Sequence, residues 1–424
     1  MNAFRKIAGL AALCLAPAVA MSADAPKASV TVYGTLNVNA QSVDATGTSP
    51  TTANVKSRVG VSVDSSNIGV RALLKVDDMI GGVAQCETSA NVDGIAGAGL
   101  CNRNSRVGLT GAWGTLFYGN WDTPYKLAAY GTKADDPFGN TDVYDAAGLM
   151  TSPGFNTTTG AYSTASNTSI TRFTIRGQNA IAYHSPAFMG LSAKLHYTSN
   201  EFKNSTGTQN PELYSGVVNW ESKDILPIPC SVLAVFEQHK DGFGLVGING
   251  TTRQLGATAA NTAGTATAAQ HTTDTGLRFG AGCQIATAAG ATTLNGTYEI
   301  LTYEQDGAPT GALSKYERTA WQVGLKHRIG DHELRARFSM ADKGKATVVG
   351  GTGNADKYGA SDLALGYAYY IVPDALQVYV YYTQITNEEK AQYTFGTGGP
   401  AAISGATPAG ADPKAFGLGA RFAF

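Results

Sequence analysis

The chain has 424 residues, of which 43% are hydrophobic and only 15% are charged, and its formal net charge is −1. A nearly neutral chain gives no sign of a nucleic-acid partner. Beyond the N-terminus, no uncharged apolar run approaches the roughly 20 residues of a spanning helix, so the mature chain is either soluble or crosses a membrane as strands.

The first residues are typical of an export signal. Arg5 and Lys6 precede an uncharged apolar stretch over 7–20, and Ala18-Val19-Ala20 forms a small-x-small cleavage site. Ala23 offers a second cleavage site. We therefore expect residues 1–20 to be a signal peptide, with cleavage after 20 or after 23, and residues 21–424 to form a single domain.

Alternation with period two, bounded by Gly, Asn, Asp, Pro and Ser, predicts a long series of strands. About sixteen are expected, with a tight turn over 64–67 joining the second to the third. The predicted strands cover 29–38, 56–63, 68–77, 103–111, 115–121, 178–184, 191–200, 212–223, 230–240, 273–285, 291–305, 316–328, 332–342, 360–371, 376–388 and 414–424.

The connections alternate between short turns and long polar loops, which favours a barrel in an outer membrane over a soluble sandwich. The last strand supports this, because Phe416, Leu418, Phe422 and Phe424 share one face while Arg421 lies on the other. We expect this strand to pair with residues 30–38 and to close the sheet. The third long loop, residues 122–174, has no convincing strand, and a loop of that length is usually functional or disordered.

Alternation also predicts which charged residues face the lumen, because a charge on the lipid face near the midplane costs about 2–4 kcal/mol. Inward acids on the strands are few: Asp77, Glu237 and Glu299. The predicted inward bases are Arg58, Arg71, Lys75, Arg106, Arg176, Lys194, Arg278, Arg318, Lys326, Arg328, Arg335, Arg337 and Arg421.

Four cysteines of the mature chain suggest two disulfides in an oxidising compartment. Cys86 and Cys101 both fall in the expected second long loop and would close a short external ring. Cys230 and Cys283 share the lipid-facing parity of their strands, and folding those strands about their loop places the two side by side. Two buried free thiols remain the alternative for this second pair.

Several short motifs occur in order along the mature chain. Val30-Thr-Val-Tyr-Gly34 follows the signal, and Ser57-Arg-Val-Gly60 lies on the second strand. Arg106-Val-Gly-Leu-Thr-Gly111 is followed by Trp113-Gly-Thr-Leu-Phe-Tyr-Gly119, and Asn179-Ala-Ile-Ala-Tyr183 precedes the next turn. Together with the terminal Arg421-Phe-Ala-Phe424, these motifs resemble the trimeric general porins of Gram-negative bacteria, in particular the β-proteobacterial group.

The resemblance implies an all-β, 16-stranded antiparallel barrel in the outer membrane, assembled as a homotrimer. It also implies that the third loop folds into the lumen and that the assembly machinery recognises the terminal Phe424. A water-filled channel for passive diffusion of small hydrophilic solutes is then expected, with no cofactor and no metal.

At the constriction, acids on the loop would face arginines on the wall and set a transverse field. Arg58, Arg106 and Arg176 are the candidates for the basic side, and Asp135 and Asp136 for the acidic side. The excess of inward bases suggests a preference for anions. The alternative for all five residues is that they only hold loops in place or are solvated at the surface.

Other functions fit less well. A substrate-selective pore for sugars or small carboxylates is the nearest alternative, followed by a plugged structural or adhesive barrel. Six scattered histidines show no metal-ligand spacing, and no nucleophile motif appears, so we do not expect an enzyme.

Overall fold

The computed structural model describes residues 27–47, 54–63, 65–92, 99–128, 132–139, 146–154, 173–199, 212–222, 225–241, 271–306, 313–351, 353, 355–395 and 408–424. The signal peptide predicted over residues 1–20 lies outside these ranges. Within them, no helix has the length and apolar character needed to cross a membrane.

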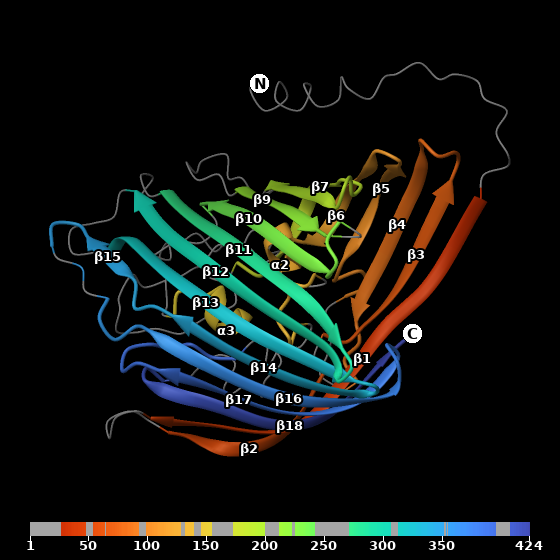
Figure 1. Ribbon diagram of the computed structural model, residues 1–424. Helices are drawn as coiled ribbons and strands as arrows, with labels where there is room; N and C mark the ends of the chain where they lie inside the picture. Colours follow the sequence, from red (N-terminus) through yellow and green to blue (C-terminus); the bar gives the residue numbers. More distant parts are fainter. Residues whose placement is uncertain are drawn as a thin grey trace.

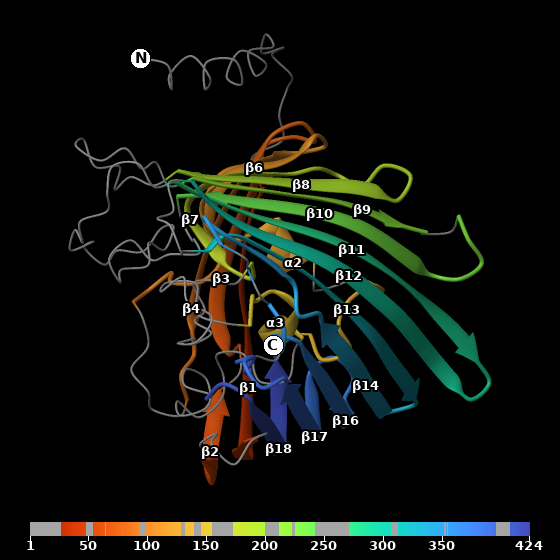
Figure 2. The ribbon, with the colours of Figure 1, turned by 90° about the vertical axis from the view of Figure 1, so that its left-hand side faces the viewer.

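All described strands belong to one antiparallel sheet that closes on itself (Figures 1 and 2). Two short helices interrupt the connection between β6 and β7. The elements are β1 (Lys27–Gly47), β2 (Val55–Val63), β3 (Asn67–Lys75), β4 (Gly81–Ser89), β5 (Ser105–Gly111), β6 (Gly114–Asp122), α2 (Pro124–Leu127), α3 (Ala147–Met150), β7 (Arg176–His184), β8 (Leu191–Ser199), β9 (Glu212–Glu221), β10 (Cys230–Lys240), β11 (His271–Thr287), β12 (Gly290–Asp306), β13 (Leu313–Ile329), β14 (His332–Ala341), β15 (Lys345–Val348), β16 (Ala360–Val372), β17 (Leu376–Asn387) and β18 (Ala411–Ala423).

The first and last strands close the barrel. β1 pairs with β18 from Thr35 opposite Ala423 to Gly47 opposite Ala411. The predicted closing pair is confirmed, although the contact lies further along β1 than expected, because the register places Phe424 opposite Gly34 and runs from there toward Gly47. Along this seam, closure satisfies backbone groups that hydrocarbon could not hydrogen-bond.

The second strand of the wall contains a bulge where the sequence predicted a turn. β2 and β3 both run antiparallel to β1, so they continue in one direction and form no hairpin. Between the pairs Val38–Val63 and Thr35–Asn67, two residues of β1 lie opposite three residues of the partner strand. The turn predicted over 64–67 is therefore wrong, because one extra residue is accommodated as a β-bulge.

β14 and β15 repeat this arrangement along β13. Ala320 pairs with Ala341 and Glu317 with Lys345, which again sets two residues against three. Each interrupted strand counts once in the wall, so the eighteen elements form sixteen strands. The predicted number of strands is confirmed, but the set of strands differs. β2 and β3 count as one strand, and β4 lies where the sequence suggested a loop.

The alternation of side chains gives the wall an apolar outside and a polar inside. Val59 is 82% exposed and Leu418 is 62% exposed on the outer face, whereas Asn39, on the inner face, is 1% exposed. Phe416 and Phe422 also point outward, as expected from the closing strand. A barrel with an exposed apolar outer face and a polar interior is suited to a lipid surround.

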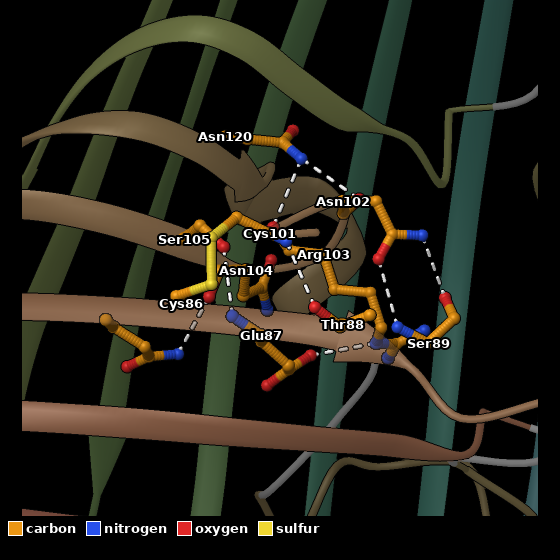
Figure 3. The surroundings of a disulfide bond; sticks show 11 residues. Cys86, Glu87, Thr88, Ser89, Cys101, Asn102, Arg103, Asn104, Ser105 and Asn120 are labelled. Atoms are coloured by element: carbon orange, nitrogen blue, oxygen red, sulfur yellow. Dashed lines mark hydrogen bonds and ion pairs between the residues drawn. A yellow bond between two sulfur atoms is a disulfide. The ribbon is translucent and has the colours of Figure 1, made fainter. Parts of the chain in front are cut away.

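Both predicted disulfides are present. Cys230 and Cys283 are direct partners in the register of β10 and β11, as the alternation predicted. Cys86 lies in β4 and not in a loop, so the first disulfide ties a strand to Cys101 in the connection that follows it (Figure 3).

Candidate functional site: the charged lumen wall

The described parts of the connection between β6 and β7 lie inside the ring of strands (Figures 1 and 2). α2 contacts β8, β9 and β10, and α3 contacts β13, β14 and β16. The Thr123 hydroxyl caps the start of α2 by accepting a hydrogen bond from Lys126 N at 3.4 Å. Both short helices therefore pack against the β8–β16 half of the wall.

A buried cluster of ion pairs and hydrogen bonds holds α2 and the end of α3 against the wall. Arg278 Nη2 lies 2.7 Å from Glu299 Oε2, and the Tyr125 hydroxyl donates to the same oxygen at 2.6 Å. Arg318 donates from Nε to Ser152 O at 2.7 Å and from Nη2 to Leu149 O at 3.0 Å. Arg318 thus satisfies carbonyl groups at the end of α3, which have no partner within the helix.

A second group of ion pairs and hydrogen bonds holds residues 132–139 against the wall, and we call each of these groups a latch. Asp136 accepts from Arg337 Nη1 at 2.9 Å and from the backbone N–H groups of Phe138 and Ala146 at 3.0 and 2.6 Å. Arg337 also pairs with Asp362 of β16. The Asp135 carbonyl accepts a hydrogen bond from the Asn295 amide. Asp136 is therefore buried against β14, and its carboxylate orders the loop around it.

The base of the loop is neutralised in the same way. Asp122, the last residue of β6, lies 3.0 Å from Arg176 Nη2 and 3.0 Å from Lys126 Nζ. Asn104 accepts from Arg176 Nε at 3.0 Å. Arg176 begins β7, so this cluster joins the two ends of the connection and fixes where it leaves and rejoins the wall.

The opposite wall, formed by β2–β5, carries bases of a different kind. Arg71 donates to Gln85 at 2.9 Å and lies 5.1 Å from the Tyr33 ring, while Arg106 lies 4.4 Å from the Trp121 ring. Arg58 is exposed on the inner face, opposite Val43 of β1. Across the described ranges, Arg58, Arg71 and Arg106 form no ion pair.

One acid is built into this wall. Glu87 lies 2.8 Å from Arg103 Nε and accepts from the Tyr33 hydroxyl at 3.0 Å, next to the first disulfide (Figure 3). The Glu87 carboxylate is therefore occupied by Arg103 and Tyr33. The basic character of the β2–β5 wall is therefore not balanced by a neighbouring carboxylate.

The remaining predicted bases also face inward but differ in their surroundings. Arg335 pairs with Glu333 at 2.7 Å, and Lys75 pairs with Asp78 at 2.5 Å beside a short turn. Lys326 is opposite Arg335 in the register and has no ion pair among the described residues. Alternation along the strands thus predicts that these side chains face the lumen, but it does not predict which acids they pair with.

Three partners in the latches were missed from the sequence: Asp122, Tyr125 and Asp362. Asp362 could have been found, because Leu363 and Leu365 face outward and place it inside. Asp122 and Tyr125 gave no such signal, since their roles depend on where the connection lies in space. Among the described residues, no group of three or more His, Cys, Asp or Glu could hold a metal ion.

Comparison with known proteins agrees with this architecture. The sequence model of the Gram-negative porin family matches residues 9–390. A search of curated protein sequences finds no match.

Solved structures show the same fold. An anion-selective porin from Comamonas acidovorans is 19% identical, with a TM-score of 0.66 over 94% of this chain and 100% of that chain. The OmpT outer-membrane protein of Vibrio cholerae in its trimer form is 16% identical, with a TM-score of 0.56 over 94% of this chain and 99% of that chain. A loop L8 deletion mutant of OmpT is 17% identical, with a TM-score of 0.57 over 94% of this chain and 99% of that chain.

A closed barrel with an apolar outside, a charged lumen and an inward-lying connection is the architecture of a pore through the outer membrane. The chain belongs to the Gram-negative porin family and is an outer-membrane channel for small solutes.

Proposed function

We propose that this channel passes small hydrophilic solutes by passive diffusion and weakly prefers anions. The observation that carries the proposal is the unequal pairing of inward charges. On the β8–β16 side, Arg278, Arg318 and Arg337 are next to carboxylates and hold the long connection. On the β2–β5 side, Arg58, Arg71 and Arg106 have no carboxylate partner among the described residues, so their charge acts on the lumen.

In this proposal the constriction lies between the described residues of the connection from β6 to β7 and the β2–β5 wall. Arg58 and Arg106 remain the basic residues expected from the sequence, and Arg71 joins them, because Arg176 is paired with Asp122. Asp136 serves the latch to Arg337, so in this proposal the acidic side of the constriction rests on Asp135. The similar anion-selective porin from Comamonas acidovorans supports this choice of ion.

The same proposal includes assembly as a homotrimer, as for the trimer form of OmpT. Residues 1–20 would direct export, and residues 21–424 would form the single barrel domain. The terminal Phe424 is 50% exposed on the lipid side and its backbone N–H donates to Gly34 O at 3.1 Å. This leaves its ring accessible to an assembly machinery before the strand is sealed in lipid.

Purified protein in a planar lipid bilayer tests this proposal. An open trimer predicts conductance that appears in groups of three equal steps. A complete absence of conductance would support the plugged structural barrel instead. Swelling of proteoliposomes in neutral sugars and in small carboxylate salts separates a general channel, which admits both, from a substrate-selective one, which admits only one class.

A further inference from the structure

The connection between β17 and β18 also turns into the barrel. Its residues 391–395, which we call the strap, are all buried, and none exposes more than 8% of its surface. Connections usually run over the surface of a protein, because a buried one must satisfy its backbone groups. Tyr393 belongs to the same hydrophobic cluster as Leu149 and Met150 of α3. The strap therefore packs against the long connection from β6 to β7.

Hydrogen bonds fix how the strap meets the residues that follow α3. Gln392 N donates to Gly154 O at 2.8 Å, and the Tyr393 hydroxyl donates to Pro153 O at 3.4 Å. The Tyr393 ring lies against Gly154, since a Cβ added to this glycine would be 2.3 Å from Tyr393 Cε2. Gly154 also has a φ of 77°, which glycine adopts without strain. The contact is thus built from both sides.

One side chain anchors the strap to the wall. Asn387, the last residue of β17, is 2% exposed. Its amide donates to Tyr393 O at 2.9 Å and accepts from Tyr393 N at 3.0 Å. The same amide donates to Ala411 O at 2.7 Å, at the start of β18. Asn387 therefore joins the end of β17, the strap and the start of β18, and it sets where Tyr393 lies.

The wall and the strap hold successive residues of the long connection. Arg318 Nε donates to Ser152 O at 2.7 Å, and the Arg318 guanidinium lies 5.8 Å from the centroid of the Tyr393 ring. Beyond Ser152, the hydrogen bonds of Pro153 O and Gly154 O come from the strap. Among the described residues, the strap is thus the last hold on this part of the long connection before residue 155.

We propose that Tyr393 is a positioning residue of the channel. Through the strap it holds residues 152–154 on the side of the wall that α3 contacts, and so keeps them out of the conducting part of the lumen. When the ring is missing, these residues leave the wall and obstruct the lumen part of the time. The inference goes beyond the proposed ion preference, because it concerns how long the channel stays fully open and not which solutes pass.

Single-channel recording of the purified full chain in a planar bilayer tests this role. The quantity to measure is the ratio of time at partially closed levels to time at the fully open level. Tyr393→Ala should raise this ratio about tenfold, which corresponds to about 1.4 kcal/mol. Tyr393→Phe keeps the ring and removes only the contact of the hydroxyl with Pro153 O, so its ratio should stay within about twofold of wild type.

Tyr381→Ala is the matched control. Tyr381 lies on the inner face of β17 and is 2% exposed, but its hydroxyl donates to Gln41 of β1 at 2.8 Å. The control removes a buried ring of the same size and should lower the free energy of unfolding, yet leave the ratio within about twofold of wild type. Equal increases in Tyr381→Ala and Tyr393→Ala would overturn the inference, because partial closure would then reflect a general loss of packing.

Gly154→Ala tests the same contact from the other side. The new Cβ would overlap the Tyr393 ring, so this variant should also raise the ratio while Tyr393 is kept. It decides the question if Tyr393→Ala yields no folded barrel, judged by heat-modifiable migration in SDS gels. A wild-type ratio in Gly154→Ala, or in folded Tyr393→Ala, would contradict the inference. Absence of all conductance in the wild type would instead contradict the proposed function.

Discussion

Inward arginines of this barrel divide into those that hold the long connection and those that face the lumen. Alternation along the strands correctly placed Arg318 and Arg337 inside, because a charge on the lipid face is costly. It could not show that both are almost fully buried, with 1% and 2% of their surface exposed. Burial depends on the connection packing over them, which no strand pattern records.

Arg337 provides the first test at this scale. Arg337→Met removes the only described base between Asp136 and Asp362, leaving two buried carboxylates together. Loss of one partner of a buried ion pair costs about 3–5 kcal/mol, so the free energy of unfolding in urea should fall by that amount. Lys357→Met, in the exposed Lys357–Glu389 pair, is the control and should change nothing measurable. Equal stability of the two variants would contradict the latch.

At the scale of elements, the two bulges explain the pattern of facing. In β2 the even-numbered Arg58 faces the lumen, whereas in β3 the odd-numbered Arg71 does, because one extra residue shifts the alternation. Alternation predicts the facing of both side chains, but the shift arises at a bulge and not at the predicted turn. A β-bulge and a tight turn can both contain a residue with positive φ, and here Ser65 has a φ of 53°.

Ser66 is predicted to stabilise the first bulge. Its hydroxyl accepts from Asn37 N at 2.8 Å and donates to Asn37 O at 3.1 Å, replacing the interrupted ladder. Ser66→Ala leaves both backbone groups unsatisfied, which should lower the free energy of unfolding by about 1–3 kcal/mol. Ser57→Ala, which removes only an exposed contact to the Ser42 hydroxyl, is the control. A smaller effect of Ser66→Ala than of Ser57→Ala would refute the role of the bulge.

The two disulfides allow a comparison between elements. Cys230 and Cys283 are 53 residues apart in sequence, and Cys86 and Cys101 are 15 apart. In the chain-entropy description these loops correspond to about 4 and about 3 kcal/mol respectively. Replacing Cys230 and Cys283 by serine should therefore destabilise the barrel more than replacing Cys86 and Cys101. The reverse order, measured by urea unfolding, would contradict that reasoning, and free thiols found by non-reducing mass spectrometry would remove its basis.

On the scale of the whole molecule, the sequence was sufficient for the barrel and insufficient for its interior. The alternation, the loop lengths and the terminal phenylalanine each follow from the lipid surround, so they could be predicted. β4 was missed because its outward residues, Gly82, Ala84, Cys86 and Thr88, are small or weakly apolar and give little alternation. The pairing of Arg176 with Asp122 depends on how the chain returns after about fifty residues, and alternation carries no information on that distance.

For the whole molecule we predict that three arginines with no acidic partner among the described residues make the lumen prefer anions: Arg58, Arg71 and Arg106. The reversal potential in a potassium chloride gradient across a planar bilayer tests this claim most directly. Wild type is predicted to give a reversal potential with the sign of the chloride equilibrium potential. Combining Arg58→Gln, Arg71→Gln and Arg106→Gln should shift the reversal potential toward the potassium equilibrium potential.

The control replaces Lys343, Lys357 and Lys390 with glutamine, which removes the same net charge. Lys343, in the bulge between β14 and β15, and Lys357, in the connection after β15, are exposed and paired with Asp356 and Glu389. The control should keep the wild-type reversal potential. A wild-type channel that prefers potassium, or an arginine variant whose reversal potential matches that of the control, would contradict the account.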